Sequence, residues 1–488
     1  MSSTTGGQTI AYDLESTLQE FGGRRPVAEE STGAGGPPAR EKAREWLDGL
    51  RPPLGAVFLA AYVLTSFLSS SLATAVFLAT GCLLLVMSVV WASAFHKALA
   101  AAGSLALGAL LLSGKFDTGT FLEGLPVYFN IVAVLMILSV AGYPIRAARF
   151  TAQIRALLSA ATGRGVGVRT TSGVLGHVLG AVLDVGSFVL IDVILRRAAP
   201  EGRIEALTWA GRTFSFTPLW ANLNVFTATT VELTGASYAG LLAVSLPFVI
   251  LGLTVILLLA QRKKDEVEEA KEALSYGALA VLLYPVLLVV AVALVNAFFP
   301  GLSLTAAISV TVAAVVVLIS ALATALLRQS SPLARLTKEA RESLVQSHAE
   351  FALFGSAGIL VVSLEALGAL APVGEMFSSL PPALVAPALA LVMSLGFVAG
   401  IHVLPLVLLI NTAFPLSDGP APALWAVAIL LGAQTTILLT PFSNSTTMLA
   451  RLTGLHPLEI GTKRNWEFGL ILALAAAAYL GLLTLLLL

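Results

Sequence analysis

The chain has 488 residues, of which 57% are hydrophobic and only 11% are charged. Soluble globular proteins carry about 25% charged residues, so this composition predicts an all-α polytopic membrane protein. Basic and acidic residues balance at 28 each, which gives no indication of a nucleic-acid partner. The single cysteine, Cys82, excludes an intramolecular disulfide and any multi-cysteine metal site.

The first 50 residues are polar and lack the basic start and apolar core of a signal peptide. We expect residues 1–50 to form a mobile cytoplasmic tail that ends in an amphipathic surface helix over Ala39–Leu50. The basic residues of that helix favour an N-terminus inside the cell.

Apolar runs that suit single membrane spans follow, separated by a cytoplasmic linker at residues 261–273. In the first half, residues 51–260, the predicted spans are Leu54–Ser70, Ala73–Ala92, Ala98–Ser113, Gly124–Tyr143 and Tyr238–Ala260. In the second half, residues 274–488, they are Leu274–Phe298, Leu304–Leu327, Phe351–Leu370 and Trp466–Leu488. Pro332–Gln346 reads as an amphipathic helix on the inner surface, and the C-terminus is expected outside.

Two further segments are predicted to be re-entrant hairpins. Gly173–Leu195 has arginines on both sides, which places both of its ends inside, and Leu183–Ser187 supplies a turn. Pro381–Phe414 is too long for one untilted span of about 20 residues. Gly400 and His402 lie near its middle, where a second turn is expected.

One pattern occurs twice, at Ala210–Gly235 and Ala433–Gly454. Each copy reads Ala-x-x-Thr-x-x-x-Thr-Pro, then an asparagine, then Leu-Thr-Gly. Proline removes a backbone donor, and irregular backbone at membrane depth persists only where protein buries it or a wet cavity hydrates it. We predict two broken transmembrane helices, and paired breaks indicate a binding site. Two proline kinks patched by Ser and Thr are the alternative interpretation.

The order of elements repeats. Gly124–Ala260 and Phe351–Leu488 each read span, hairpin, broken helix, span, and they start on opposite sides of the membrane. This order predicts an inverted repeat with about eleven transmembrane helices and two re-entrant hairpins.

Polar residues at the breaks and turns are the candidate ligands. Asp184 is an intramembrane acid, either functional or a partnered structural group, whereas Asp192 is expected to form an ion pair. His402 could couple protons or contact a solute, or be a core histidine, and Arg212 could neutralise an anion or snorkel to the surface. The substrate-binding candidates are Asn222, Asn224, Ser443, Asn444, Ser445, Thr446, His402 and Arg212. The ion-binding candidates are Asp184, Ser187, Thr217, Thr440, Gly186 and Gly400.

These motifs, together with Glu350–Gly358 (EFALFGSAG), resemble the ion transporter superfamily, and within it the divalent anion:sodium symporters and their arsenite, citrate and sodium/proton relatives. The resemblance implies an elevator-type homodimer in which Ser-Asn-Thr at each hairpin tip binds substrate carboxylates and sodium. Neither expected tip here carries Ser-Asn-Thr, while Ser443–Ser445 resembles it in composition.

The sequence therefore predicts a secondary active transporter in a prokaryotic cytoplasmic membrane, moving a small anionic organic solute with a sodium or proton gradient. No phosphate loop, zinc-protease or serine-hydrolase motif appears, so we expect no enzyme activity and no cofactor beyond a possible sodium ion. The alternatives are a cation/proton antiporter that uses Asp184 and, from another class, a membrane enzyme or assembly subunit.

Overall fold

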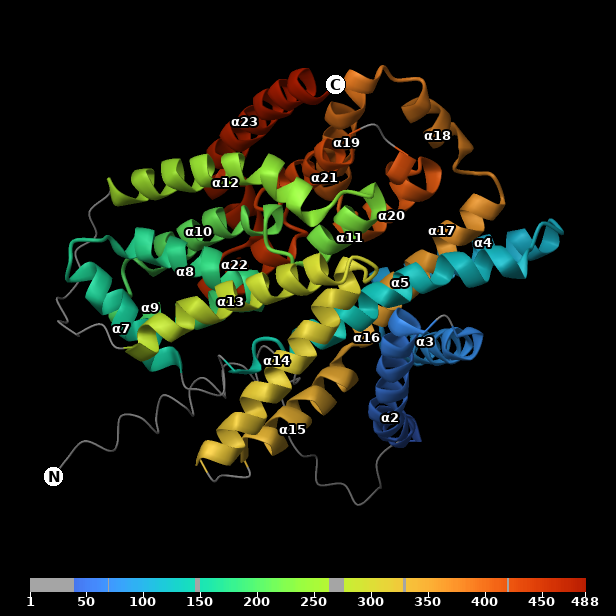
Figure 1. The fold of residues 1–488 in the computed structure, drawn as a ribbon, viewed down its shortest axis with the longest axis horizontal. Helices are drawn as coiled ribbons and strands as arrows, with labels where there is room; N and C mark the ends of the chain where they lie inside the picture. The colour runs from blue at the N-terminus through green and yellow to red at the C-terminus, as the bar shows by residue number, and fades with distance from the viewer. Residues whose placement is uncertain (1–38, 69, 145–149, 263–275, 328–330, 419–420) are drawn as a thin grey trace.

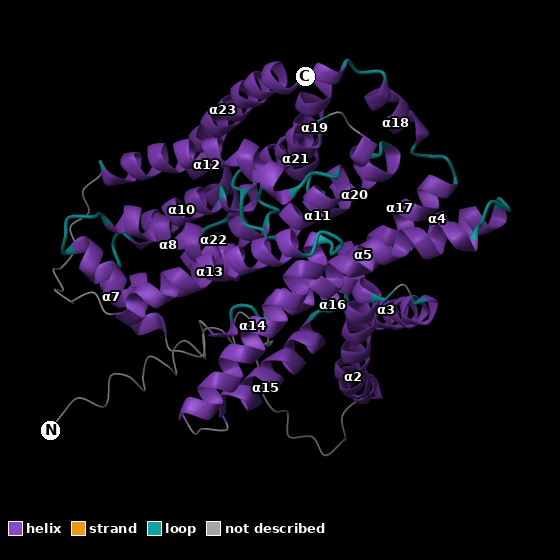
Figure 2. Cartoon of the chain, viewed as in Figure 1, coloured by secondary structure: helices purple, strands orange, loops and turns teal. Residues whose placement is uncertain are grey.

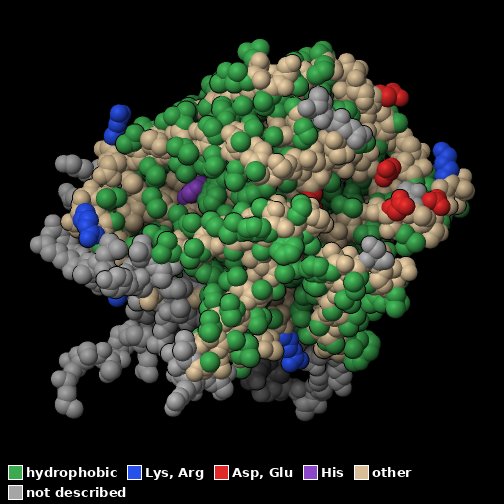
Figure 3. Space-filling model, viewed as in Figure 1, with side chains coloured by type: hydrophobic (Ala, Val, Ile, Leu, Met, Phe, Trp, Pro, Cys, Tyr) green, Lys and Arg blue, Asp and Glu red, His purple; other side chains and the backbone are tan. Residues whose placement is uncertain are grey.

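The computed structural model describes residues 39–68, 70–144, 150–262, 276–327, 331–418 and 421–488. Every regular element in these ranges is a helix (Figure 2). Eight helical segments among them are long and apolar enough to cross a membrane. Hydrophobic side chains cover most of the face in Figure 3, with few charged ones. The chain is thus an all-α polytopic membrane protein, as its composition predicts.

The difference between eight spans and the expected eleven has a simple cause. Two of the expected spans are the broken helices, and each half of a broken helix is too short to cross a membrane by itself. The third is the expected span Leu274–Phe298, of which only the shorter apolar segment Leu282–Phe298 is found in the described residues. The expected tail up to residue 38 and most of the expected linker lie outside the described residues.

The first group of helices packs mainly on itself and on helices from the middle of the chain (Figure 1). Its members are α2 (Ala39–Phe67), α3 (Ser71–Trp91), α4 (Ala94–Leu112) and α5 (Thr118–Ser139). The helices that join them are α14 (Leu304–Leu327), α15 (Ser331–Gln346), α16 (His348–Glu350), the π-helical turn η2 (Phe351–Gly355) and α17 (Ser356–Ala366). We call this set the scaffold.

The separate surface helix expected over Ala39–Leu50 is wrong, because α2 continues through Pro52 and Pro53 to Phe67. Arg51 explains the continuity. Its side chain is buried, and it donates from Nη2 to the Met87 carbonyl of α3 at 3.1 Å. It also pairs with Asp48 one turn earlier at 3.2 Å. The turn before the prolines is therefore held inside the scaffold.

The second group consists of two matching series of helices. The first series is α8 (Val168–Leu183), α9 (Gly186–Ala198), α10 (Arg203–Phe214), the 3-10 turn η1 (Thr217–Leu219), α11 (Val225–Thr234) and α12 (Tyr238–Gln261). The second series is α19 (Pro382–Val398), α20 (Val403–Ala413), α21 (Pro422–Thr436), α22 (Asn444–Thr453) and α23 (Arg464–Leu487). Connecting elements are α7 (Phe150–Thr162), α13 (Tyr276–Phe298), α18 (Ala371–Ser378), η3 (Leu416–Asp418) and the π-helical turn η4 (Glu459–Lys463). We call the two series the repeat domain.

Each series packs a hairpin arm along a broken helix, α8 along α10 and α19 along α21. Glycine makes both contacts possible. A Cβ atom on Gly176 would lie 2.7 Å from the Ala210 carbonyl oxygen, and one on Gly432 would lie 2.7 Å from the Ala390 Cα. Both neighbours are backbone atoms, so no rotamer change relieves the overlap. Small residues at such crossings let helix backbones approach closely in membranes.

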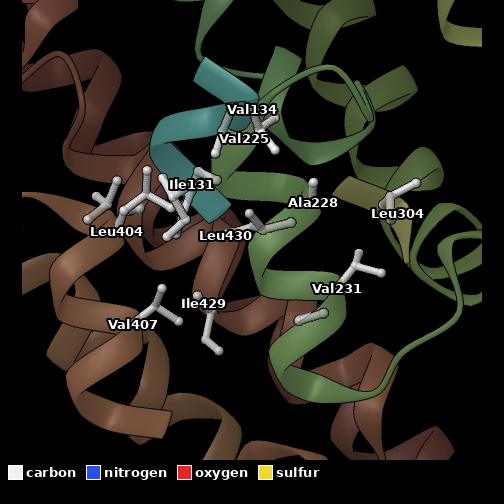
Figure 4. Packing of buried hydrophobic residues seen from close by; sticks show 14 of the residues in the cluster. Ile131, Val134, Val225, Ala228, Val231, Leu304, Leu404, Val407, Ile429 and Leu430 are labelled. Carbon is white, nitrogen blue, oxygen red and sulfur yellow. The ribbon is translucent and has the colours of Figure 1, made fainter. Parts of the chain in front are cut away.

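The two series also interlock through a common core. Val225, Ala228 and Val231 of α11 lie between side chains of α5 and of the second series (Figure 4). The other residues labelled there are Ile131 and Val134 of α5, Leu304 of α14, and Leu404, Val407, Ile429 and Leu430 of the second series. The second half of the first broken helix is therefore packed by elements that come much later in the chain.

Gly432→Ala tests the close approach between α19 and α21. We expect the added methyl group to lower the free energy of unfolding by about 2 kcal/mol, because it meets backbone. Gly481→Ala on α23 is the matched control, since nothing lies within 4 Å of its Cβ position. That change should leave stability unchanged or raise it by up to about 1 kcal/mol through helix propensity. Thermal unfolding in detergent measures both, and equal shifts in the two variants would contradict the packing argument.

Candidate functional site

A cavity of about 870 Å³ lies where the two hairpin turns and the two helix breaks meet. Asp184 lines it from the first turn and His402 from the second. The breaks contribute Pro218, Asn224 and the run Phe442–Ser445. The scaffold closes the other wall with His96, Leu135, Leu138, Glu350, Leu353 and Phe354. The cavity therefore lies between the scaffold and the repeat domain.

The repeated Thr-Pro pattern builds both breaks in the same way. In the first, the Thr227 hydroxyl donates to the Pro218 carbonyl at 2.5 Å. In the second, the Thr447 hydroxyl donates to the Pro441 carbonyl at 3.4 Å. In each break, a threonine hydroxyl of the resumed helix thus donates a hydrogen bond to a carbonyl of the irregular segment. Backbone carbonyls inside a membrane need such a partner within the protein.

Capping side chains restart the helices after the breaks. Asn224 Oδ1 accepts from the backbone N–H groups of Phe226 and Thr227 at 3.1 and 3.3 Å. Ser443 Oγ accepts from the Thr446 N–H at 3.0 Å. At the second hairpin turn, His402 Nδ1 accepts from the Leu404 N–H at 3.4 Å. These are N-cap interactions, which satisfy otherwise free helical donors.

Four helix N-termini line the cavity, those of α9, α11, α20 and α22. Their first residues or caps, namely Val185, Asn224–Phe226, His402–Leu404 and Ser443–Ser445, belong to its wall. The N-terminal end of a helix carries roughly half a positive charge. The cavity thus combines four partial positive ends with a lining whose described residues include no lysine or arginine. This arrangement favours an anionic group of a solute.

Asp184 has an unusual backbone conformation at the first turn. Its φ is +50°, the one positive value at a non-glycine residue in the described ranges. Its carbonyl accepts from the Ser187 hydroxyl at 2.8 Å, which closes the turn, and its side chain is exposed to the cavity. At the second turn the residue with a positive φ is Gly400, at +89°, and a glycine adopts this conformation without strain. A strained polar residue on a cavity wall is typical of functional sites.

The structure brings seven of the fourteen candidate residues to the cavity. These are Asp184, Asn224, Gly400, His402, Ser443, Asn444 and Ser445. Asn444 is exposed to it, and Asn224 is half-buried. The other seven lie outside the lining, namely Gly186, Ser187, Arg212, Thr217, Asn222, Thr440 and Thr446. Most of this second set makes hydrogen bonds that shape the breaks.

Asn222 and Thr217 illustrate this supporting role. Asn222 is fully buried, and its Nδ2 donates to the Val289 carbonyl of α13 at 2.9 Å. The Thr217 hydroxyl lies 3.3 Å from His177 Nδ1. Trp220 Nε1–H donates to His177 Nε2 at 3.0 Å, which leaves Nδ1 as the protonated nitrogen that donates to the Thr213 carbonyl at 2.9 Å. His177 thus ties the first hairpin to the first break.

Arg212 is held by α23 and does not reach the cavity. Its Nε donates to Asn465 Oδ1 at 2.9 Å and its Nη2 to the Arg464 carbonyl at 2.7 Å. The guanidinium also lies 4.7 Å from the centre of the Trp209 ring. Arg212 therefore neither neutralises a solute in the cavity nor extends to the membrane surface. Its hydrogen bonds join α10 to the start of α23.

Asp192 forms the ion pair that the sequence predicts. Its Oδ2 accepts from Arg196 Nε at 2.8 Å, and its Oδ1 accepts from Arg203 Nε. The carboxylate is fully buried within α9 and does not belong to the cavity lining. It therefore fastens α9 to α10.

Three polar residues of the cavity, Glu350, Gln434 and His96, had no role assigned from the sequence. Glu350 immediately precedes the π-helical turn η2, and such turns often mark functional sites. Gln434 interrupts an apolar stretch of α21, where the first copy of the pattern has glycine at the equivalent position, Gly211. This difference between the two copies of the pattern is the sequence signal that could have indicated a role for Gln434.

No protein-family model matches the chain, and no curated protein matches its sequence. Among solved structures, the fold is similar to the one described as "Crystal structure of the Alcanivorax borkumensis YdaH transporter reveals an unusual topology". The two are 16% identical, with 75% of this chain and 86% of the other covered, at a TM-score of 0.43. The neighbour is described as a transporter.

Arg212→Met distinguishes a structural arginine from a solute ligand. We expect the free energy of unfolding to fall by about 2–3 kcal/mol, because two charge-assisted hydrogen bonds to the start of α23 are lost. The apparent affinity for any transported solute should not change. Arg262→Met, at the exposed end of α12, is the control and should be neutral in both measurements. A lower solute affinity in the Arg212→Met variant, with no change in the Arg262→Met control, would show that Arg212 belongs to the binding site.

Proposed function

We propose that the protein is a secondary active transporter for a small carboxylate-bearing organic solute, driven by a sodium or proton gradient. The observation that carries this proposal is the meeting of four helix N-termini in one cavity between two hairpin turns and two helix breaks. Helix ends at broken membrane helices serve as sites for anionic groups, and exposed carbonyls beside them suit hard cations such as sodium.

The packing supports an elevator movement. Both hairpins and both breaks belong to the repeat domain, whose two series contact each other directly, α11 with α20 and α21 and α10 with α22. The core around α11 also includes Ile131 and Val134 of the scaffold helix α5 (Figure 4). The cavity lies against the scaffold, so a shift of the repeat domain along the scaffold carries the bound solute with it. We further propose a homodimer in a prokaryotic cytoplasmic membrane with the N-terminus inside and the C-terminus outside, as the family resemblance and the arginine placement imply.

A cation/proton antiporter is the second candidate, and Asp184 is the observation in its favour. A carboxylate that faces a cavity at membrane depth is a proton or cation carrier by default. This function requires no organic solute. Its current would depend on cation and pH gradients alone, and Asp184→Asn would abolish it.

Transport currents on a solid-supported membrane separate the two candidates. Proteoliposomes are challenged with di- and tricarboxylates, amino acids and inorganic oxyanions, each with a sodium gradient, a proton gradient or neither. A current that requires both a solute and one cation supports the symporter and identifies the coupling ion. A current without solute supports the antiporter, and no current under any condition contradicts both.

Asn224→Asp and Asn444→Asp test the anion site with little change in shape. Asp retains the cap at Asn224, and a negative charge at a helix N-terminus does not weaken the helix, so stability should be preserved. The added charge should lower the apparent affinity for the solute about tenfold or more by repulsion in the cavity.

Ser237→Asp is the matched control, because Ser237 caps α12 outside the cavity and can be replaced by another capping acid. Transport by this variant should equal that of the unmodified chain. Unaltered affinity in both asparagine variants, measured as the concentration dependence of the current, would falsify the anion site.

A further inference from the structure

The charge balance of the cavity does not suit a solute that is only negative. Among the residues that the structure describes, its lining holds two carboxylates, Asp184 from the repeat domain and Glu350 from the scaffold, and neither lysine nor arginine. Helix N-termini supply only partial positive charges. A solute with two or three carboxylates would bring further negative charge beside both acids without a cationic side chain to pair it, which a desolvated site disfavours.

Two buried acceptor atoms of this lining have no hydrogen-bond partner within the part of the chain that the structure describes. Gln434 is 3% exposed, and its Oε1 has no hydrogen bond; Glu350 Oε2 is also buried and unpaired. Buried acceptors are rarely left unsatisfied in native proteins, so both atoms require a donor, which a bound solute can supply. An ammonium group offers three donors and a positive charge. The acceptors therefore indicate a cationic group on the solute.

The helix breaks offer groups that suit a negative charge rather than a positive one. The first turns of α11 and α22 present helix N-termini, and the Asn444 side chain is exposed there. These groups suit a carboxylate, as argued above for the anion site. One cavity thus offers a place for each sign of charge.

The rest of the wall is aromatic and aliphatic. Six phenylalanines line the cavity, namely Phe95, Phe214, Phe226, Phe354, Phe397 and Phe442. A volume of about 870 Å³ far exceeds what two small charged groups fill. Apolar walls with a few convergent polar groups are typical of sites for partly hydrophobic ligands. The solute is therefore expected to carry a bulky apolar body.

We propose that the transported solute is a zwitterion with a large apolar body, such as an apolar amino acid or a compound of that class. Glu350 and Gln434 accept its ammonium group, the N-terminal turns of α11 and α22 hold its carboxylate, and the phenylalanines enclose its body. This inference rests on the proposed transport function and specifies its substrate class.

Binding to the detergent-solubilised full chain tests the charge pattern without requiring transport. Titration calorimetry compares three probes with one body: L-phenylalanine, 3-phenylpropanoate without the ammonium group, and 2-phenylethylamine without the carboxylate. A second series uses L-leucine, 4-methylpentanoate and isoamylamine. We expect the zwitterion of at least one series to bind about tenfold or more tightly than both analogues. Equal binding of either analogue in both series, or no binding by any probe, overturns the proposal.

Variants connect the preference to the named residues. Glu350→Gln and Gln434→Met should each reduce the preference for the zwitterion over its deaminated analogue, a ratio that general loss of stability leaves unchanged. Glu375→Gln, an exposed acid on α18 outside the cavity, is the control and should preserve that ratio. An unchanged ratio in both test variants contradicts the assignment.

Transport currents measured on proteoliposomes distinguish the proposed ligand class from the proposed transport function. Zwitterion binding that never drives a current would refute the transporter but keep the ligand class. A current driven by dicarboxylates, in a protein that binds no zwitterion, would keep the transporter and refute the ligand class.

Discussion

The fold depends on one constraint: inside a membrane, every backbone polar group must find its partner within the protein. Two breaks in transmembrane helices are possible here because each is closed from within. The hydroxyl groups of Thr227 and Thr447 donate to the carbonyls of Pro218 and Pro441, and capping side chains restart both helices. The breaks can then present helix ends to a cavity, and the two hairpin turns complete its wall.

The same constraint explains why half of the polar residues near the breaks lie outside the cavity. Asn222 and Thr217 hold irregular backbone in place, with the help of His177. Arg212 and Asp192 join helices of the repeat domain, where an unpaired charge would be costly. The cavity lining includes two buried acceptors that lack a hydrogen bond among the described residues, Gln434 Oε1 and Glu350 Oε2.

Much of the architecture could be predicted from the sequence, because it follows from local rules. Proline after threonine in an apolar run marks a break, and a run such as Pro381–Phe414 is too long for a single span. The direction of each side chain could not be predicted, since it depends on neighbours from distant parts of the chain. Arg212 is an example, because its partners belong to α23. The continuity of α2 through two prolines likewise depends on the Met87 carbonyl of another helix.

The interlocked core has a consequence for biosynthesis. The helix α11 packs against α20 and α21, which leave the ribosome much later than α11 itself. At about 5–20 residues per second, the wait is on the order of ten seconds. Throughout that interval the apolar face of α11, with Val225, Ala228 and Val231, lacks its final neighbours from α20 and α21. During this time the repeat domain is incomplete, and a chain truncated before α19 would leave α11 without its contacts to α20 and α21.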